Sequence, residues 1–401
     1  MVMLAGLMAG CAGLAPPEQA SCPAPVVCTA CQVCPAVPSP EQPTPPPARA
    51  ELFTAASFAD LPGWRDEDMN NVLGALRGSC GRLRGNPAWQ EACAAANGAG
   101  SAGLREFFES RFVPWQVTAA NGSSEGLVTG YYEPLLRGSR ARRGAYAVPL
   151  YAPPDDLLTI DLSAVNPDLR NLRLRGRIEG RRVVPYFSRA EIERGAAPLA
   201  GKELVWVDDA IEAFFLQIQG SGRIQLDSGE TVRLGYADQN GHPYFSIGRT
   251  LIERGDLRAN EASMQGIQAW ARANPSRLQE LLAQNPSYVF FRELPRQSGD
   301  PALGPPGAMG VPLTPERSIA VDPRFIPLGA PVFLATTRPG SNEALNRLVF
   351  AQDTGGAIRG EVRADYFWGF GAEAGREAGR MRQQGRMWIL WPKGSQPAKA
   401  Q

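Results

Sequence analysis

The residues of this sequence best suited to chemistry are aspartates in glycine-rich or aromatic segments. Asp353 opens the glycine-rich run 353–358, and Asp365 opens the aromatic run 365–369. A strand that ends near Phe350 would deliver Asp353 into a turn, because the glycines that follow let the chain reverse. Asp365 would then face the same groove as Asp353. The spacing therefore predicts two carboxylates at one site, where carboxyl groups can act as a general acid or base.

Other catalytic classes lack the residues they need. His242 is the only histidine, and its turn at 240–244 favours a hydrogen-bonded surface role. Metal sites built on several histidines are therefore excluded. With one histidine, a serine-hydrolase triad has little support, and the sequence has no Gly-x-x-x-x-Gly-Lys-[Ser/Thr] phosphate loop. The run 220–222 is too short for a dinucleotide-binding fingerprint.

Aromatic and polar residues near glycines indicate a polysaccharide substrate. Sugar rings present apolar faces that stack on aromatic side chains, and hydroxyls that take hydrogen bonds. The residues suited to both contacts gather in 129–134, 217–222 and 365–369. The candidate substrate-binding residues are Thr129, Gly130, Tyr131, Tyr132, Gln219, Gly220 and Ser221. Buried packing is the alternative role for Tyr131 and Gln219.

Taken together, these segments resemble the MltA-type family of membrane-bound lytic murein transglycosylases. The resemblance extends from about residue 125 to residue 391. The segments that carry it follow one another in a fixed order: 129–134, 215–222, 240–248, 263–265, 285–291, 319–329, 353–358 and 365–367. So many segments in one order make the resemblance specific.

The resemblance implies a mainly β fold with short peripheral helices. In that fold a double-psi β-barrel is interrupted by an inserted second β-rich domain, and a substrate groove runs between the two. The implied organisation is a lipoprotein-type signal segment 1–10, a Pro-rich tether 11–50, the first part of the barrel with N-terminal helices 51–133, the inserted domain 134–296, the second part of the barrel with a three-aspartate segment 297–393, and a tail 394–401.

The resemblance also implies an activity and a site. Glycan strands of peptidoglycan would be cleaved between N-acetylmuramic acid and N-acetylglucosamine to leave 1,6-anhydromuramic acid ends, without metal or cofactor. Carried over residue by residue, the acid/base is Asp365, and Asp353 and Asp322 are its companion aspartates. The implied partners are peptidoglycan glycan strands, with a cell-wall synthesis or hydrolysis complex left open as a further partner.

One carboxyl can perform both steps of this reaction. To protonate the glycosidic oxygen it must stay protonated near neutral pH, so desolvation or a nearby like charge such as Asp353 must raise its pKa. The resulting carboxylate can then remove a proton from the 6-hydroxyl of the sugar, which attacks the anomeric carbon. Because the attack is intramolecular, no enzyme nucleophile is needed.

Two other functions remain open at this point. An inverting hydrolase would use Asp353 or Asp322 to activate water opposite Asp365, with the carboxyls about 6.5–9.5 Å apart. A non-catalytic lipoprotein could bind the cell wall for structural reasons, although retention of all three aspartates argues against it.

The elements that must position these residues follow from the hydrophobic periodicity. Helices are expected around 66–76, 89–95, 104–112, 263–270, 275–283 and 373–383, and strands begin after residue 126 and recur at 319–321, 332–334, 348–350 and 387–391. Cys80 and Cys93 bracket a short helical hairpin and form the predicted disulfide.

Length and composition limit the broad class of protein. The chain has 401 residues, which predicts two or three compact units. Lys and Arg number 41 and Asp and Glu 40, so a formal net charge of +1 argues against general nucleic-acid binding. A hydrophobic fraction of 44% allows a packed core. No apolar run approaches the roughly 20 residues that a transmembrane helix needs.

The N-terminal sequence predicts a membrane anchor followed by a spacer. The apolar segment 1–10 leads through small residues into Cys11, which resembles a bacterial lipoprotein signal cleaved before a lipidated cysteine. Eleven prolines between residues 12 and 50 predict an extended tether. Its four further cysteines lack a second ligand pair for zinc and have no assignable disulfide partners. We therefore expect a lipid-anchored protein on the periplasmic face of the outer membrane.

Overall fold

The computed structural model describes residues 51–100, 102–169, 174–295 and 302–397. The chain divides into two units, Met1–Ala48 and Arg49–Gln401, and every described residue belongs to the second. The predicted signal segment and tether, Cys11 included, lie outside the described residues. Among the described residues, no helix has the length and apolar character needed to cross a membrane.

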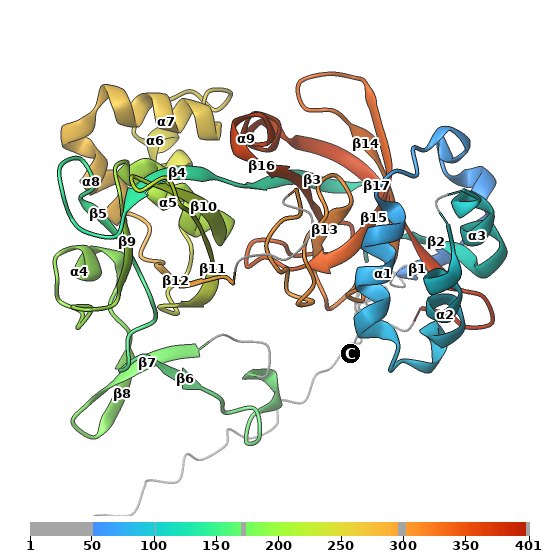
Figure 1. The fold of residues 1–401 in the computed structure, drawn as a ribbon, viewed down its shortest axis with the longest axis horizontal. Helices are drawn as coiled ribbons and strands as arrows, with labels where there is room; N and C mark the ends of the chain where they lie inside the picture. The colour runs from blue at the N-terminus through green and yellow to red at the C-terminus, as the bar shows by residue number, and fades with distance from the viewer. Residues whose placement is uncertain (1–50, 101, 170–173, 296–301, 398–401) are drawn as a thin grey trace, which may run out of the picture. The chain divides into compact units, whose positions relative to one another are not determined.

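Strands from both ends of the second unit meet in one eight-stranded sheet (Figure 1). In pairing order they are β1 (Phe53–Ala55), β2 (Phe112–Val117), β17 (Arg382–Pro392), β14 (Pro331–Thr337), β15 (Ala344–Asp353), β13 (Ser318–Val321), β16 (Ala364–Phe370) and β3 (Gly126–Glu133). β3 also pairs with β17. The strands from β17 to β3 therefore form a closed ring of pairings.

This ring is built from apolar and β-branched runs, which suit strands that are buried on both faces. The residues of β14 from Pro331 to Thr336 are all buried. Phe333 and Phe350, on neighbouring strands, have no exposed surface. Gln352 is also fully buried, and its amide donates to the carbonyl of Ala75 and to the hydroxyl of Ser79. These two hydrogen bonds fix the first helix against the ring.

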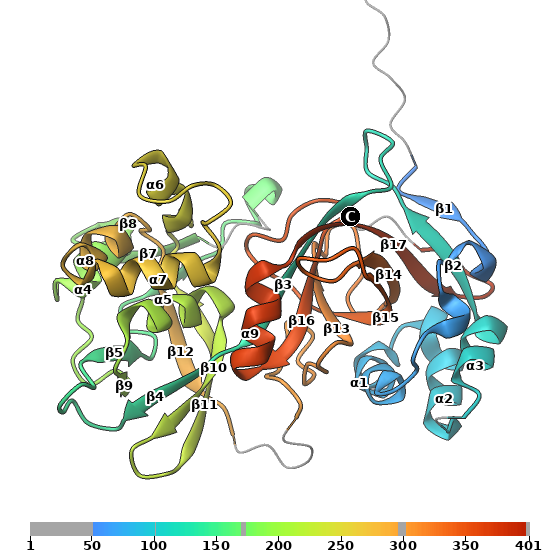
Figure 2. The same ribbon diagram turned by 90° about the horizontal axis from the view of Figure 1, so that it is seen from above.

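Short helices pack around the ring (Figure 2). They are α1 (Val72–Leu83), α2 (Gln90–Gly98), α3 (Leu104–Arg111) and α9 (Gly371–Arg380). The Sγ atoms of Cys80 on α1 and Cys93 on α2, the predicted pair, are joined in a disulfide of 2.05 Å. α9 packs against β3 and β16, the two strands that carry most of the candidate site.

The strands between β3 and β13 form two further sheets. The larger has the order β12 (Val289–Glu293), β11 (Thr231–Gln239), β10 (Ser221–Leu226), β4 (Leu135–Ser139), β9 (Glu203–Val207) and β5 (Val148–Tyr151). The smaller consists of β6 (Leu158–Ile160), β7 (Leu174–Glu179) and β8 (Arg182–Pro185). The helices here are α4 (Arg189–Glu193), α5 (Ala210–Gln219), α6 (Ile247–Glu253), α7 (Met264–Ala273) and α8 (Pro275–Ala283). The described fold is therefore mainly β, as predicted.

Two helix boundaries differ from the prediction, each because of a long-range contact. The first helix begins at Val72 and not near residue 66. Glu67, in the segment before it, is buried, forms an ion pair with Arg317 and accepts the backbone N–H of Leu348 at 3.1 Å, which fixes that segment outside the helix. The last helix ends at Arg380, because the residues from 382 to 385 pair with β3 as part of β17.

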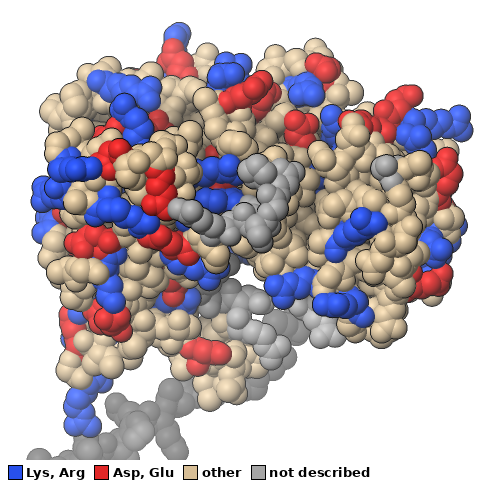
Figure 3. All heavy atoms as spheres, in the orientation of Figure 1, with Lys and Arg blue, Asp and Glu red and all other residues tan. Residues whose placement is uncertain are grey.

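Acidic and basic side chains are interspersed over the face shown in Figure 3. This mixture agrees with the nearly equal numbers of Lys and Arg, 41, and of Asp and Glu, 40. The visible face therefore offers no single-sign field over the described residues that would attract polyanions from a distance.

Candidate active site

Asp365 lies on β16, between β13 and β3. It pairs with Ala320 of β13 on one side and with Thr129 of β3 on the other. The hydroxyl of Thr129 donates a hydrogen bond of 2.5 Å to Oδ1 of Asp365. The residue as a whole is partly exposed, and the pairings on both sides fix its backbone in the sheet.

The surroundings of Asp365 favour its protonated form. Burial among protein atoms raises the pKa of this carboxyl from 3.8 to about 6, and the charge of Asp353 adds to the rise. The hydrogen bond from Thr129 and the charge of Arg363 act in the opposite direction. Desolvation therefore contributes more to the rise than the like charge of Asp353.

Asp353 ends β15 and lies on the other side of β13 from Asp365. It pairs with the same residue, Ala320, at an irregularity in the β13–β15 pairing. Two strand spacings therefore separate the backbones of the two aspartates, about 10 Å. The two carboxyls still interact electrostatically, since the charge of Asp353 acts on the pKa of Asp365.

Several donors hold the Asp353 carboxyl. Its Oδ1 accepts the backbone N–H groups of Ala308 at 2.8 Å and Thr354 at 2.9 Å. Its Oδ2 accepts the hydroxyl of Tyr131 at 3.0 Å. Burial raises the pKa of Asp353 above its ordinary value, although these hydrogen bonds oppose the rise. The arrangement fixes the direction in which the carboxylate points.

The two faces of β3 have different roles. Thr129 and Tyr131 are two residues apart, so they point to one face, and both contact an aspartate. Gly130 and Tyr132 point to the other face, against α9. A Cβ atom on Gly130 would lie 2.7 Å from Nε1 of Trp368, so this position has room only for glycine. The structure thus brings Thr129 and Tyr131 to the aspartates, and Gly130 and Tyr132 to the helix.

Asp322 follows β13 and is fully buried. Its carboxylate accepts two arms of the Arg324 guanidinium and the backbone N–H of Gly360 at 2.9 Å. Burial alone would raise the pKa of Asp322, but these donors more than compensate and lower it. Asp322 is therefore an ionised group near neutral pH that holds the loop leading into β16.

Gln219, Gly220 and Ser221 lie where α5 ends and β10 begins. The Oε1 atom of Gln219 accepts the backbone N–H of Tyr132 at 3.0 Å, which ties the end of α5 to β3. Gly220 ends the helix with a φ of 79°, a left-handed conformation that favours glycine. The structure brings these residues beside Tyr132 and not into hydrogen-bond contact with the aspartates.

Glu133, at the end of β3, was not predicted to have a role, although it stands within the motif 129–134. It is fully buried, and its carboxylate forms ion pairs with Arg223 at 2.8 Å and Arg233 at 3.2 Å. Both arginines also donate to the carbonyl of Leu303, on the chain segment that returns to the ring. This buried ion cluster fixes the exit of β3 and the return segment together.

Arg363 was also missed as a site residue. Its guanidinium donates to the Thr129 hydroxyl at 2.9 Å and to the Leu127 carbonyl at 3.3 Å. Its position directly before β16, two residues from Asp365, is the signal that could have identified it.

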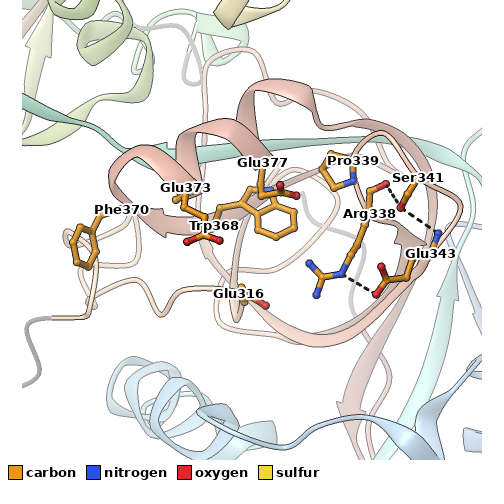
Figure 4. A pocket seen from close by; sticks show the side chains of 10 residues that line it. Glu316, Arg338, Pro339, Ser341, Glu343, Trp368, Phe370, Glu373 and Glu377 are labelled. Carbon is orange, nitrogen blue, oxygen red and sulfur yellow. Dashed lines mark hydrogen bonds and ion pairs between the residues drawn. The ribbon is translucent and has the colours of Figure 1, made fainter.

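A cavity of about 620 Å³ lies apart from the aspartates (Figure 4). Its walls come from the β14–β15 connection, β16 and α9, and the residues that line it are Glu316, Arg338, Pro339, Ser341, Glu343, Trp368, Phe370, Glu373, Ala374 and Glu377. Arg338 forms an ion pair of 3.2 Å with Glu343. The cavity contains none of the predicted site residues.

Within the described ranges, no three His, Cys, Asp or Glu side chains are grouped so that they could hold a metal ion. His242 lies away from the aspartates, and its Nε2 atom is 2.7 Å from the carbonyl oxygen of Tyr186. This contact agrees with the predicted hydrogen-bonded role.

Comparison with known proteins identifies the family. The model of the MltA specific insert domain matches residues 127–292, and the model of the 3D domain matches residues 317–391. The chain is 33% identical over 336 residues to membrane-bound lytic murein transglycosylase A of Escherichia coli (strain K12), which covers 80% of this chain and 81% of that protein.

Comparison with solved structures leads to the same family. The crystal structure of MltA from Neisseria gonorrhoeae, monoclinic form, superposes with a TM-score of 0.76 at 43% identity, covering 86% of this chain and 94% of that one. E. coli MltA with bound chitohexaose superposes with a TM-score of 0.64 at 28% identity, covering 87% and 99%. These proteins are lytic murein transglycosylases. The chain belongs to the MltA family, which confirms the resemblance seen in its sequence.

Proposed function

We propose that this enzyme cleaves the glycan strands of peptidoglycan between N-acetylmuramic acid and N-acetylglucosamine, with Asp365 as its single acid and base. Membership of the MltA family supports the reaction class. The observation that carries the residue assignment is the raised pKa of Asp365, about 6, at a residue that the sheet leaves partly exposed. A polysaccharide substrate is supported by the relative that binds chitohexaose.

In the first step the protonated Asp365 donates its proton to the glycosidic oxygen, and the bond to the anomeric carbon breaks. The carboxylate then takes the proton of the 6-hydroxyl of the muramic acid, whose oxygen attacks the anomeric carbon. A 1,6-anhydro ring forms and Asp365 is protonated again. The nucleophile belongs to the substrate, so the attack is effectively unimolecular.

The other two aspartates have supporting roles in this mechanism. Asp353 lies across Ala320 from Asp365, and its charge contributes to the raised pKa of the acid. The Asp322 carboxylate accepts hydrogen bonds from Arg324 and Gly360. It therefore holds the loop leading into β16 and takes no part in proton transfer. An inverting hydrolase would instead need Asp353 to activate water.

We also propose that the closed ring is a double-psi β-barrel and that residues 134–296 are an inserted β-rich domain. The ring takes its strands from before residue 134 and after residue 317, and the strands between them pair only with one another among the described strands, which supports this division. A substrate groove would run between the two domains. The residues that would line this groove are Tyr131 and, near the end of β3, Gln219 and Ser221.

The N-terminus fits a membrane-associated enzyme. We propose that Cys11 carries lipid, that residues 11–50 form a spacer, and that the protein works on the periplasmic face of the outer membrane. Curated relatives are named membrane-bound, which supports the proposal. Changing Cys11 to Ser should release the chain from membranes in fractionation without changing its activity. A wild-type chain found wholly in the soluble fraction would contradict the lipid anchor and leave the enzymatic proposal intact.

The test of the reaction is a digest of purified sacculi by the full chain, with the products analysed by mass spectrometry. Muropeptides that end in 1,6-anhydromuramic acid are expected. Products heavier by one water would indicate a hydrolase, and unchanged sacculi that retain the protein would indicate a binding protein.

A further inference from the structure

The hydroxyl of Thr129 lies between a permanent cation and the proposed acid. Its oxygen is 2.9 Å from Nη2 of Arg363 and 2.5 Å from Oδ1 of Asp365. The Arg363 guanidinium is held in place by a second donation, to the carbonyl of Leu127 at 3.3 Å. Arg363, Thr129 and Asp365 therefore form a chain of hydrogen bonds across the β3–β16 pair.

The direction of this hydrogen-bond chain follows from the chemistry of its members. A guanidinium has donors and no acceptor, so Arg363 must donate to the Thr129 oxygen. The single hydroxyl proton of Thr129 then has one acceptor, Oδ1 of Asp365, among the contacts of the described residues. The separation of 2.5 Å is typical of a hydroxyl that donates to a carboxylate.

We propose that Thr129 and Arg363 are positioning residues that keep the proton of Asp365 on Oδ2. This inference rests on the proposed function, in which Asp365 is the general acid. In a carboxylic acid the unprotonated oxygen is the better hydrogen-bond acceptor, so the hydrogen bond from Thr129 favours Oδ1 as the unprotonated oxygen and leaves the proton on Oδ2. Oδ2 takes no hydrogen bond from the described residues, and it is the oxygen left to face the glycosidic bond. The acid would thus present its proton in one direction.

Thr129 and Arg363 also limit the rise in the pKa of Asp365. The groups that act on Asp365 are the Thr129 hydroxyl and the cation of Arg363, which favour its ionised form, and the charge of Asp353, which opposes ionisation. The Tyr131 phenol also faces both aspartates. Removing the Thr129 hydroxyl or the Arg363 charge should therefore raise the pKa of Asp365. A general acid with a higher pKa stays protonated to higher pH.

The test compares Thr129→Val, Thr129→Ser and Arg363→Met in the full chain, with sacculi as substrate. Thr129→Val should lower kcat on the acidic plateau by about tenfold or more, because the proton is no longer directed at the substrate. The alkaline limb of its pH–rate profile should move to higher pH, and its KM should change by less than about twofold. Thr129→Ser should restore both kcat and the limb. Arg363→Met should move the limb in the same direction as Thr129→Val.

The matched control is Thr336→Val. The hydroxyl of Thr336 donates at 2.7 Å to the carbonyl of Gln384 in the same sheet, away from the aspartates, so its removal should leave the limb in place. A rise in KM with an unchanged limb in Thr129→Val would overturn the proposal and make Thr129 a substrate contact. Failure of Thr129→Ser to restore the limb would also overturn it.

A second measurement does not depend on activity. In ¹³C NMR of Asp-labelled protein, the carboxyl resonance that disappears in Asp365→Asn should titrate at higher pH in Thr129→Val and Arg363→Met. An unchanged midpoint in both variants would overturn the proposal. An active Asp365→Asn variant would instead contradict the proposed function, so the two failures can be told apart.

Discussion

The phenolic hydroxyl of Tyr131 donates a hydrogen bond of 3.0 Å to Oδ2 of Asp353. Two residues earlier on the same strand, Thr129 donates to Asp365. One face of β3 therefore holds two carboxylates that come from opposite sides of β13, and a shift of β3 by one residue would turn both hydroxyls away from them. The register of this strand sets the geometry of the site.

Asp365→Asn should abolish cleavage. Asparagine keeps nearly the same shape but cannot deliver or recover the proton, and general acid–base catalysis is typically worth about 10²–10⁴-fold. Initial rates of muropeptide release would measure the loss, with binding to sacculi as the control for folding.

Asp353→Asn should retain part of the activity, because Asp353 only adjusts the pKa of the acid and positions it. Equal, near-total loss in both variants, with hydrolytic products from the wild type, would contradict the single-acid mechanism.

Asp365→Asn should also be more stable than the wild type at pH 7. The folded-state pKa of Asp365, about 6, exceeds its ordinary value of 3.8, so folding disfavours the ionised carboxyl above pH 3.8. The variant should gain about 1–3 kcal/mol in the free energy of unfolding at pH 7. Near pH 3 the gain should vanish, because both states of the wild type are then protonated. Urea unfolding at both pH values would measure it, and an equal gain at both would exclude this carboxyl as the cause.

Tyr131→Phe should reduce turnover with little loss of folding. The ring keeps its packing against Phe367, at a centroid distance of 5.1 Å, while Asp353 loses one of its donors. We expect kcat to fall by about three- to tenfold and stability to fall by about 1 kcal/mol.

Tyr186→Phe is the matched control, because the Tyr186 hydroxyl donates at 2.8 Å to Asp156, far along the chain from the site. It should lose a similar stability and no activity. A large drop in melting temperature of Tyr131→Phe with unchanged activity per folded molecule would assign Tyr131 to the core.

Asp322→Asn should lower stability most above pH 4. The folded-state pKa of Asp322 is lowered from 3.8, so the ionised form is favoured by folding, and this contribution is present above pH 3.8 and lost as the pH falls further. Because Arg324 is partly exposed, we expect a loss of about 1–2 kcal/mol at pH 7. Thermal melts from pH 3 to pH 7 would measure it. A difference that stays constant down to pH 3 would contradict the ionic role of Asp322.

The double variant Cys80→Ser/Cys93→Ser should be less stable and equally active. The disulfide closes a loop with a sequence separation of 13, and loops of that size contribute about 2–4 kcal/mol. Both cysteines lie on α1 and α2, away from the aspartates. Denaturant unfolding and kcat at a temperature where both proteins are folded would test this. Loss of kcat in the folded variant would show that these helices also support the site.

Local features of this protein can be predicted from its amino-acid sequence alone. Glycine turns after apolar strands predicted that Asp353 and Asp365 face one groove, since turn chemistry is a property of a few adjacent residues. In the structure both residues pair with Ala320 of β13. The spacing of Cys80 and Cys93 predicted their pairing for the same reason. The strands at 332–334 and 348–350 were visible as buried apolar runs.

Contacts between elements that are far apart in the sequence follow from the packing of the whole chain. The pairing of β3 with β17 closes the ring and ends α9 at Arg380, and it joins residues more than 250 positions apart. The contact of Arg363 with Thr129, and the pairing of both aspartates with Ala320, depend on the same strand order. Local patterns do not select the strand order, because many pairings bury similar apolar area; the packing of the whole chain selects one of them.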